Sequence, residues 1–405
     1  MMERRKNLND KFGFVQIMEV KQLVKIPDVL FFQEGPGVRN SQYTEEGIKL
    51  LNVANLVDGK IDLTTSNRYI SESEAYGKYK HFLCDDGDFI VASSGIKVEY
   101  INKKMGFVTK SMLPLCMNTS TIRFKVLDKN RLDIKYFMYY LKSQNFKNQL
   151  YKYITGSAQL NFGPSHLKKI SFPLCDIGEQ RIIVNNMELI TKIMDSYNEQ
   201  LEKYDELVKA RFIEMFGDPV SNSKHLPLKT LPQLGTFGRG VSKYRPRNAP
   251  ELLNGPYPLI QTGDIANAEL YIKNYNSTYS EVGLKQSKMW DKGTLCITIA
   301  ANIAKTAILQ FDACFPDSVV GFNGNNFTNN IFVHYWFSFF QEILENQAPE
   351  SAQKNINLKI LSELQIITPD IIEQNKFANF IQQVDKSRFD IKKSITELER
   401  EVVYD

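Results

Sequence analysis

The chain has 405 residues, 43% of them hydrophobic, and a formal net charge of +4. This length predicts two or three domains, and the hydrophobic content is sufficient for packed cores. No apolar run reaches the roughly 18 residues of a membrane-spanning helix, and none follows the charged N-terminus MMERRKN, so we expect neither a membrane span nor a secretory signal. The five scattered cysteines have no CxxC spacing, which predicts reduced thiols rather than a disulfide framework.

The charge is unevenly distributed along the chain. Residues 1–170 carry 26 Lys and Arg against 17 Asp and Glu, whereas residues 217–368 carry 13 against 12. A surplus confined to one part of the chain indicates a polyanion-binding surface there, although a basic surface that is merely solvated gives the same composition. The near-neutral part would have to bind a polyanion through a local patch.

The first globular domain is predicted at residues 1–176. A Gly/Pro loop, FFQEGPGVRN, occupies residues 31–40. Short apolar runs bounded by Gly and Asp predict strands, and an apolar pattern of helical period followed by Gly156 predicts a helix at 131–154. The strands are expected at 48–56, 88–92, 107–109 and 121–126.

A long helix is predicted at residues 177–216, ended by Gly217-Asp218-Pro219. Its apolar and aromatic residues alternate steps of four and three, which is the heptad pattern of a helix packed lengthwise on a partner. We expect the partner to be a second helix at 370–405, because adding 194 to each position gives an apolar residue in all cases but one. The predicted coiled-coil positions are Ile183, Met187, Ile190, Met194, Tyr197, Leu201, Tyr204 and Val208, with Phe377, Ile381, Val384, Arg388, Ile391, Ile395, Leu398 and Val402.

A second globular domain, residues 217–369, repeats the order of the first. Strands are predicted at 256–262, 294–300 and 306–310, and a helix at about 329–346. Short motifs recur at the same offset of 194, which chance would not maintain. We therefore predict two α/β (α+β) domains with an internal pseudo-twofold repeat, joined and separated by two antiparallel coiled-coil helices. The recurring motifs are Ser157-Ala158-Gln159 with Ser351-Ala352-Gln353, and Asp176-Ile177-x-Glu179-Gln180 with Asp370-Ile371-x-Glu373-Gln374.

Catalytic motifs are absent from the sequence. It contains no GxxxxGK[ST] loop, no Asn/Asp-Pro-Pro-aromatic motif of amino-methyltransferases, and no ligand spacing among its four histidines, so we predict no metal site. Pro369, Asp370, Glu373 and Lys376 imitate a nuclease motif. However, the first repeat shows that the acidic pair simply opens a helix, where carboxylates complement the helix dipole.

The strongest candidate for binding is the Gly/Pro-rich loop GRGVSKYRPR, because Arg can contact guanine edges or phosphates bidentately and Tyr can add phosphate contacts. The other candidates follow predicted strands or lie in the corresponding loops of the first half. For each of them, a solvated loop residue that contacts no DNA is an equally good interpretation. The predicted contacts are Arg239, Lys243, Tyr244, Arg245, Arg247, Thr262, Asn302 and Lys305, with Arg39, Asn40, Asn52, Asn55 and Lys97 in the first half.

These features together resemble the specificity (S) subunit of Type I restriction–modification enzymes. The resemblance covers nearly the whole chain: a heptad helix closing each half, the GSAQ and ESAQ entries, and the step from Pro173 to Gln180. Two segments look like target-recognition domains of that family, EGPGVRN…GIKLLNVANLVDGKI and GRGVSKYRPRNAPELLNGPYPLIQTGDI. One departure is Arg388, which occupies a helix-seam position where the first repeat has Met194.

The resemblance implies a non-catalytic DNA-binding subunit of a cytoplasmic restriction system in a bacterium or archaeon. Each globular half would recognise one part of a split, asymmetric site in double-stranded DNA, and the helices would set the spacer. Two modification (methyltransferase) subunits would dock on the helices. This chain would bind no cofactor, while S-adenosylmethionine, ATP and Mg would be held by the modification and restriction (endonuclease) subunits.

Alternative interpretations remain at the level of sequence. The chain could serve a modification-only methyltransferase, or be a coiled-coil scaffold without DNA binding. A single-chain nuclease or methyltransferase would require the acidic or Asn-Pro-Pro motifs that the sequence lacks.

Overall fold

The computed structural model describes residues 22–153, 160–300, 303–347 and 356–401. The chain divides into two compact units: residues 1–196 with 394–405, and residues 197–393. Within the described ranges, no helix combines the length and the apolarity needed to cross a membrane.

The first unit is built on an antiparallel sheet, and aromatic side chains pack against this sheet in the hydrophobic core. Phe89 and Phe124 are fully buried on neighbouring strands, and the Phe124 ring lies 5.2 Å from that of Phe137 on helix α3 (Ile134–Lys142). These runs of aromatic and β-branched residues form strands because such side chains pack well on a pleated, buried surface. The strand order is β2 (Leu30–Glu34), β11 (Thr121–Val126), β7 (Phe89–Ala92), β9 (Met105–Phe107).

A second, smaller sheet of the first unit supports the loops. Its central strand β3 (Ile48–Leu51) pairs in parallel with β10 (Leu115–Met117) and antiparallel with β6 (Tyr69–Ile70). Short elements complete the unit: β4 (Leu56–Val57), β5 (Lys60–Ile61), β8 (Ser94–Ile96), β12 (Leu160–Asn161), α2 (Glu72–Tyr76), α4 (Gln144–Tyr153) and α5 (Pro164–Leu167).

The helix predicted at 131–154 is in fact two helices, α3 and α4, so that prediction was wrong. Ser143 separates them with an extended backbone, and its hydroxyl accepts a hydrogen bond from the amide of Phe146 at 3.1 Å. A serine in this position caps the following helix and thereby ends the preceding one. Similarly, the predicted strand 48–56 ends at Leu51 and is followed by a 3-10 turn at Val53–Asn55.

The second unit repeats this architecture, with the same order of the first four strands in its main sheet and one further strand in each sheet. Its main sheet runs β15 (Gly235–Arg239), β23 (Val319–Gly324), β20 (Leu295–Thr298), β21 (Thr306–Leu309), β17 (Tyr271–Ile272). In its second sheet, β16 (Leu253–Leu259) again pairs in parallel with one neighbour, β22 (Ala313–Cys314), and antiparallel with the other, β18 (Ser277–Tyr279). The predicted two-domain repeat is therefore confirmed. The remaining elements are β19 (Met289–Trp290), α7 (Leu231–Leu234), α8 (Thr262–Ala266), α9 (Glu281–Lys285), α10 (Asn330–Gln347) and α11 (Leu358–Glu363).

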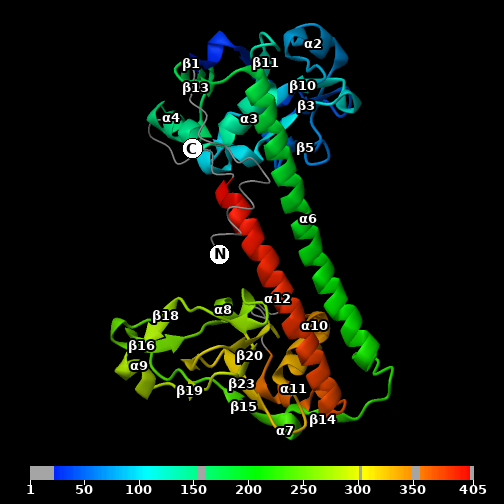
Figure 1. The fold of residues 1–405 in the computed structure, drawn as a ribbon, viewed down its shortest axis with the longest axis vertical. Helices are drawn as coiled ribbons and strands as arrows, with labels where there is room; N and C mark the ends of the chain where they lie inside the picture. The colour runs from blue at the N-terminus through cyan, green and yellow to red at the C-terminus, as the bar shows by residue number, and fades with distance from the viewer. Residues whose placement is uncertain (1–21, 154–159, 301–302, 348–355, 402–405) are drawn as a thin grey trace. The chain divides into compact units, whose positions relative to one another are not determined.

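Each globular half is closed by a pair of antiparallel strands that joins its beginning to its end. In the first unit β1 (Gln22–Lys25) pairs with β13 (Ser171–Leu174), and in the second β14 (Leu228–Thr230) pairs with β24 (Gln365–Ile367). The long helices follow directly: α6 (Ile177–Phe216) after β13 and α12 (Ile371–Glu401) after β24 (Figure 1).

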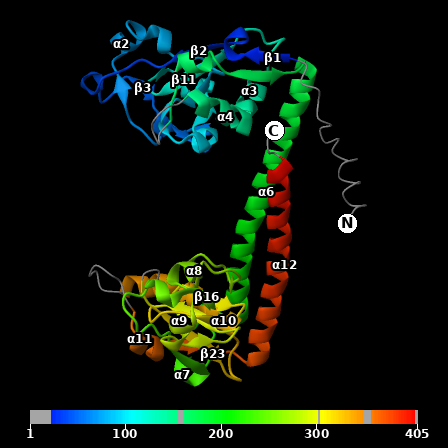
Figure 2. The same cartoon turned by 90° about the vertical axis from the view of Figure 1, so that its left-hand side faces the viewer.

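The predicted helix seam lies on the protected faces of α6 and α12. All of its described members are buried or half-buried, while the intervening Ile182 and Leu189 are more than two-fifths exposed. In the second unit the pairing is antiparallel, because Phe212 and Phe216 at the end of α6 contact Phe377 at the beginning of α12. The ribbons of α6 and α12 lie side by side there in Figure 2. Val402 and the two Ser-Ala-Gln motifs lie outside the described residues.

A buried glutamine fixes the beginning of each long helix to its own globular half. The Gln180 carboxamide accepts a hydrogen bond from the amide of Asp133 at 2.9 Å and donates to the carbonyls of Arg131 and Cys175. The equivalent Gln374 accepts from the amide of Asn329 at 3.0 Å. It also accepts from the Thr328 hydroxyl and donates to the carbonyls of Phe327 and Pro369. Both glutamines are 0% exposed, so each long helix is locked to the N-terminus of α3 or α10.

We expect Gln374→Ala to lower the free energy of unfolding of the second unit by about 2 kcal/mol, because it leaves buried backbone groups without partners. Trp290 and Trp336 are the only tryptophans of the chain, and both lie in this unit. Their fluorescence during urea denaturation therefore measures it selectively. Gln382→Ala, at an exposed position of α12, is the control. Equal midpoints for the two variants would show that the glutamine does not stabilise the junction.

Candidate nucleic-acid interface

The predicted binding loop of the second unit follows β15 and is held from both sides. The Gln286 side-chain oxygen accepts hydrogen bonds from the amides of Lys243 and Tyr244, at 2.7 and 3.1 Å. At the start of the loop, a Cβ on Gly240 would lie 2.2 Å from the carbonyl oxygen of Phe315, so only glycine fits there. The loop is thus an ordered element that presents its side chains on the surface.

The cations of this loop differ in their partners. Arg247 forms an ion pair with Asp317 at 2.5 Å, and Arg245 lies 3.7 Å from the same carboxylate while donating to two loop carbonyls. Arg239 and Lys243 are exposed and form no ion pair with a described carboxylate. The side chains of Arg245 and Arg247 remain about half exposed, so Asp317 orients them without removing them from solvent.

Tyr244 in the same loop donates a hydrogen bond to the Glu251 carboxylate at 2.7 Å. This bond raises the pKa of the Tyr244 hydroxyl and lowers the pKa of Glu251. The phenol is therefore neutral at physiological pH, and its hydrogen points toward the carboxylate rather than toward a ligand.

The remaining predicted residues of the second half lie in different settings. Thr262 is the first residue of α8 and is half-buried. Lys305 is half-buried too, and its ammonium group donates to Gln341 at 3.0 Å; its contact with DNA stays a prediction. Asn302 lies outside the described residues.

In the first unit the predictions for Asn52 and Asn55 were wrong. Asn55 is 0% exposed and its side chain donates to the carbonyl of Asp62 at 3.0 Å, while Asn52 is 8% exposed and donates to the carbonyl of Leu50. Buried amides with such partners hold the turn after β3 and are not available to a ligand. Arg39, Asn40 and Lys97 are exposed on loops and remain predicted contacts.

Sequence reasoning missed two contacts between a cation and an aromatic ring on the first unit. Lys49 and Tyr69 face each other across β3 and β6, and Arg68 lies over the ring of Tyr43. The signal in the sequence was weak, since it consists of an Arg next to a Tyr at 68–69 and a Lys twenty residues earlier. The register of β3 and β6 was needed to place Lys49 opposite Tyr69.

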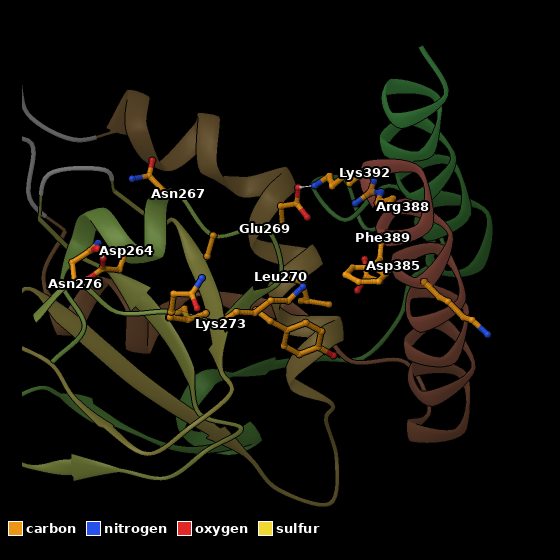
Figure 3. A pocket seen from close by; sticks show the side chains of 15 residues that line it. Asp264, Asn267, Glu269, Leu270, Lys273, Asn276, Asp385, Arg388, Phe389 and Lys392 are labelled. Atoms are coloured by element: carbon orange, nitrogen blue, oxygen red, sulfur yellow. Dashed lines mark hydrogen bonds and ion pairs between the residues drawn. The ribbon is translucent and has the colours of Figure 1, made fainter. Parts of the chain in front are cut away.

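A groove of about 580 Å³ lies in the second unit between the segment Asp264–Asn276 and α12 (Figure 3). Two of its cations form ion pairs: Lys392 with Glu269, and Arg388 with Asp205 of α6. Burial raises the pKa of Asp385 on the same side of α12. The lining of the groove thus combines cations with carboxylates. The ion pair with Asp205 shows that Arg388, the one charged residue among the helix-seam positions, connects α12 to α6.

Other polar groups of the chain have structural roles. The imidazole of His334 shares a hydrogen bond of 2.9 Å with the Thr306 hydroxyl, and burial lowers its pKa to about 4, so it is neutral at physiological pH. All five cysteines are free thiols. Among the described residues, no group of His, Cys, Asp and Glu could hold a metal ion.

Comparisons with known proteins agree on one family. A family model described as the Type I restriction modification DNA specificity domain matches residues 22–203 and 230–400. The specificity subunit of the Type I restriction enzyme MjaVIII from Methanocaldococcus jannaschii is 25% identical over 198 residues. That match spans 48% of this chain and only 45% of the relative.

Two solved structures have a similar fold. The S subunit of a Type I restriction–modification system from M. genitalium aligns over 96% of this chain and 97% of its own, with a TM-score of 0.54 and 16% identity. A chain from a structural study of complex assembly in the type I R-M system aligns over 94% and 95%, with a TM-score of 0.57 and 15% identity. Since the family model matches both halves, the chain belongs to the Type I restriction modification DNA specificity family and carries two copies of its domain.

Proposed function

We propose that this chain is the DNA sequence-specificity subunit of a Type I restriction–modification complex, in which each globular half recognises one half of a split DNA site. The observation that supports this most strongly is the duplication. The family domain matches twice, the two main sheets share the order of four strands, and each copy is locked to a long helix by an equivalent buried glutamine. Two similar but unequal domains suit a site with two different halves.

The proposal assigns no catalysis to this chain. Two modification subunits would dock on α6 and α12 and carry S-adenosylmethionine, while restriction subunits would supply ATP- and Mg-dependent cleavage in the cytoplasm. The length of α6, 40 residues, would set the number of base pairs between the half-sites. If the complex only methylates DNA and does not cleave it, this chain would use the same surfaces.

Methylome sequencing tests the proposal. We expect a host carrying this gene and its modification subunit to show a split methylated motif that disappears when the gene is deleted. Restoring the chain with Arg245→Ala and Arg247→Ala should weaken or relax one half of the motif only, because both arginines lie in the second unit and a lost bidentate base contact is worth about 1–3 kcal/mol.

Lys292→Ala, an exposed cation in a turn of the same unit, serves as the control and should leave the motif intact. A methylated motif that persists after deletion of the gene would refute the proposal. A change in both halves caused by the loop variant would refute independent recognition by the two domains.

A further inference from the structure

Asp317 lies in the tight turn between β22 and β23, where the amide of Val319 donates to the carbonyl of Pro316 at 3.0 Å. The binding loop of the second unit, residues 238–247, is anchored on this turn, because the amide of Gly240 donates to the carbonyl of Val319 at 2.8 Å. The backbone thus places Asp317 beside the loop, with 37% of its side chain exposed.

The first unit builds the same junction without a carboxylate. There the amide of Gly35, after β2, donates to the carbonyl of Thr121 in β11, also at 2.8 Å. The turns before β11 and β23 have the sequences CMNTSTI and CFPDSVV, which place Thr119 where the second unit has Asp317. A neutral residue is therefore compatible with this turn and with the anchored loop, so the fold does not require the charge of Asp317.

The two arginines beside Asp317 are held in different ways. The Nη1 group of Arg245 donates to the carbonyls of Ser242 and Tyr244, at 2.6 and 2.8 Å, and thereby closes the loop on itself. The Nη2 group of Arg247 donates to the Asp317 carboxylate at 2.5 Å, and no other described residue accepts a hydrogen bond from this side chain. Since a guanidinium has five N–H donors, a second N–H on Nη2 and both on Nη1 of Arg247 remain for a ligand.

A carboxylate next to an exposed arginine has two opposite effects on DNA binding. It holds the guanidinium in one plane, so that less conformational entropy is lost when the group forms two parallel hydrogen bonds. It also offsets part of the positive charge and repels phosphates, which lowers the affinity for every sequence. The ion pair of Arg247 and Asp317 therefore favours discrimination between bases over general affinity.

We propose that Asp317 is a positioning residue of the second half-site, which directs Arg247 to the O6 and N7 atoms of a guanine in the major groove. The inference rests on the proposed function and extends it to one pair of residues. Arginine recognises a guanine edge by bidentate contact with these two acceptors, and the ion pair supplies the fixed plane that this contact requires. Without the carboxylate, Arg247 would bind a neighbouring phosphate, and its contact would carry no sequence information.

The test uses the full chain assembled with its modification subunits. Bound molecules are selected and sequenced from a duplex pool randomised at the second half-site, and affinity is also measured for a duplex that lacks the selected site. Asp317→Asn should lower discrimination at one position of the second half-site about tenfold and leave the first half-site unchanged. It should also bind the duplex without the site roughly threefold more tightly at low salt. The slope of log affinity against log salt should steepen by about one, because the released arginine neutralises a phosphate.

A double-substitution cycle shows whether Asp317 acts through Arg247. Arg247→Ala should relax the same position about 10- to 100-fold, and the double variant should discriminate no worse than Arg247→Ala alone. Asp291→Asn, which removes an exposed carboxylate from the turn after β19, is the control and should leave both the discrimination and the salt slope unchanged. The urea midpoint of tryptophan fluorescence should be the same for Asp317→Asn and the unsubstituted chain, because the first unit forms this junction without the charge.

The outcomes separate the inference from the function on which it rests. If the unsubstituted complex selects no site, the proposed function fails. If it selects a site at which Asp317→Asn keeps full discrimination, this inference alone fails. Additive losses in the double variant would also overturn it, because Asp317 would then contact a base itself, as a carboxylate can accept from cytosine N4. A lowered urea midpoint with equal losses at all positions would make the carboxylate a structural group instead.

Discussion

Phe212→Ala is expected to lower the free energy of unfolding of the second unit by about 4 kcal/mol, near the upper end for a large-to-small core substitution. Phe212 is 0% exposed and lies near the end of α6. Its ring centre lies 5.0 Å from that of Phe216, 5.5 Å from Phe332, 4.9 Å from Phe339 and 5.4 Å from Phe377. The substitution removes the side chain that joins α6, α10 and α12, and three helices cannot all move to fill the cavity.

The measurement is the urea midpoint of tryptophan fluorescence, which reports on the second unit. Ile213→Ala is a matched control, since it lies one residue further along the same helix and is 46% exposed. It should cost less than about 1 kcal/mol. A loss for Phe212→Ala as small as that of Ile213→Ala would mean that the aromatic cluster does not stabilise the junction of the three helices.

Arg123→Met is expected to destabilise the first unit by roughly 3 kcal/mol, because removal of Arg123 leaves the buried Asp88 carboxylate with only the more exposed Lys125 as a partner. Arg123 is 5% exposed on β11 and pairs with Asp88, 3% exposed, at 3.1 Å. It also donates to the carbonyls of Leu83 and His81, at 2.7 and 2.9 Å. Methionine keeps the apolar stem but satisfies none of these groups. Lys125, 3.2 Å from Asp88, remains as a more exposed partner.

Hydrogen exchange followed by mass spectrometry would detect this loss as faster exchange in β7 and β11. The tryptophan transition should not move, since both tryptophans lie in the second unit. Lys129→Met, in the exposed turn after β11, is the control for charge removal. Unchanged protection of β7 and β11 in Arg123→Met would contradict a structural role for the buried pair.

The long helices and the repeat could be predicted from sequence because both are encoded by local spacing. The steps of three and four in α6 recur 194 residues later, and they require no knowledge of distant contacts. The same comparison marked Gln180 and Gln374 as equivalent. It could not show their role, because their hydrogen-bond partners come from the loops before α3 and α10, about 45 residues away in sequence.

The binding residues were harder to predict, because exposure is a property of the tertiary structure. Asn52 and Asn55 follow a strand, as contact residues often do, yet cross-strand neighbours enclose them. Conversely, the contact between Lys49 and Tyr69 could not be predicted, because only the pairing of β3 and β6 places the two residues opposite each other.

The strand pairs β1–β13 and β14–β24 have an evolutionary consequence. Each brings the two ends of a globular half to opposite positions of an antiparallel ladder, where Cα atoms lie about 5 Å apart. Because each globular half begins and ends at the same strand pair, it can be replaced by a domain of different length without altering the long helices that flank it. The coding segments between these strands are thus natural units of genetic exchange. One crossover at each end would transplant a complete globular half with its surface.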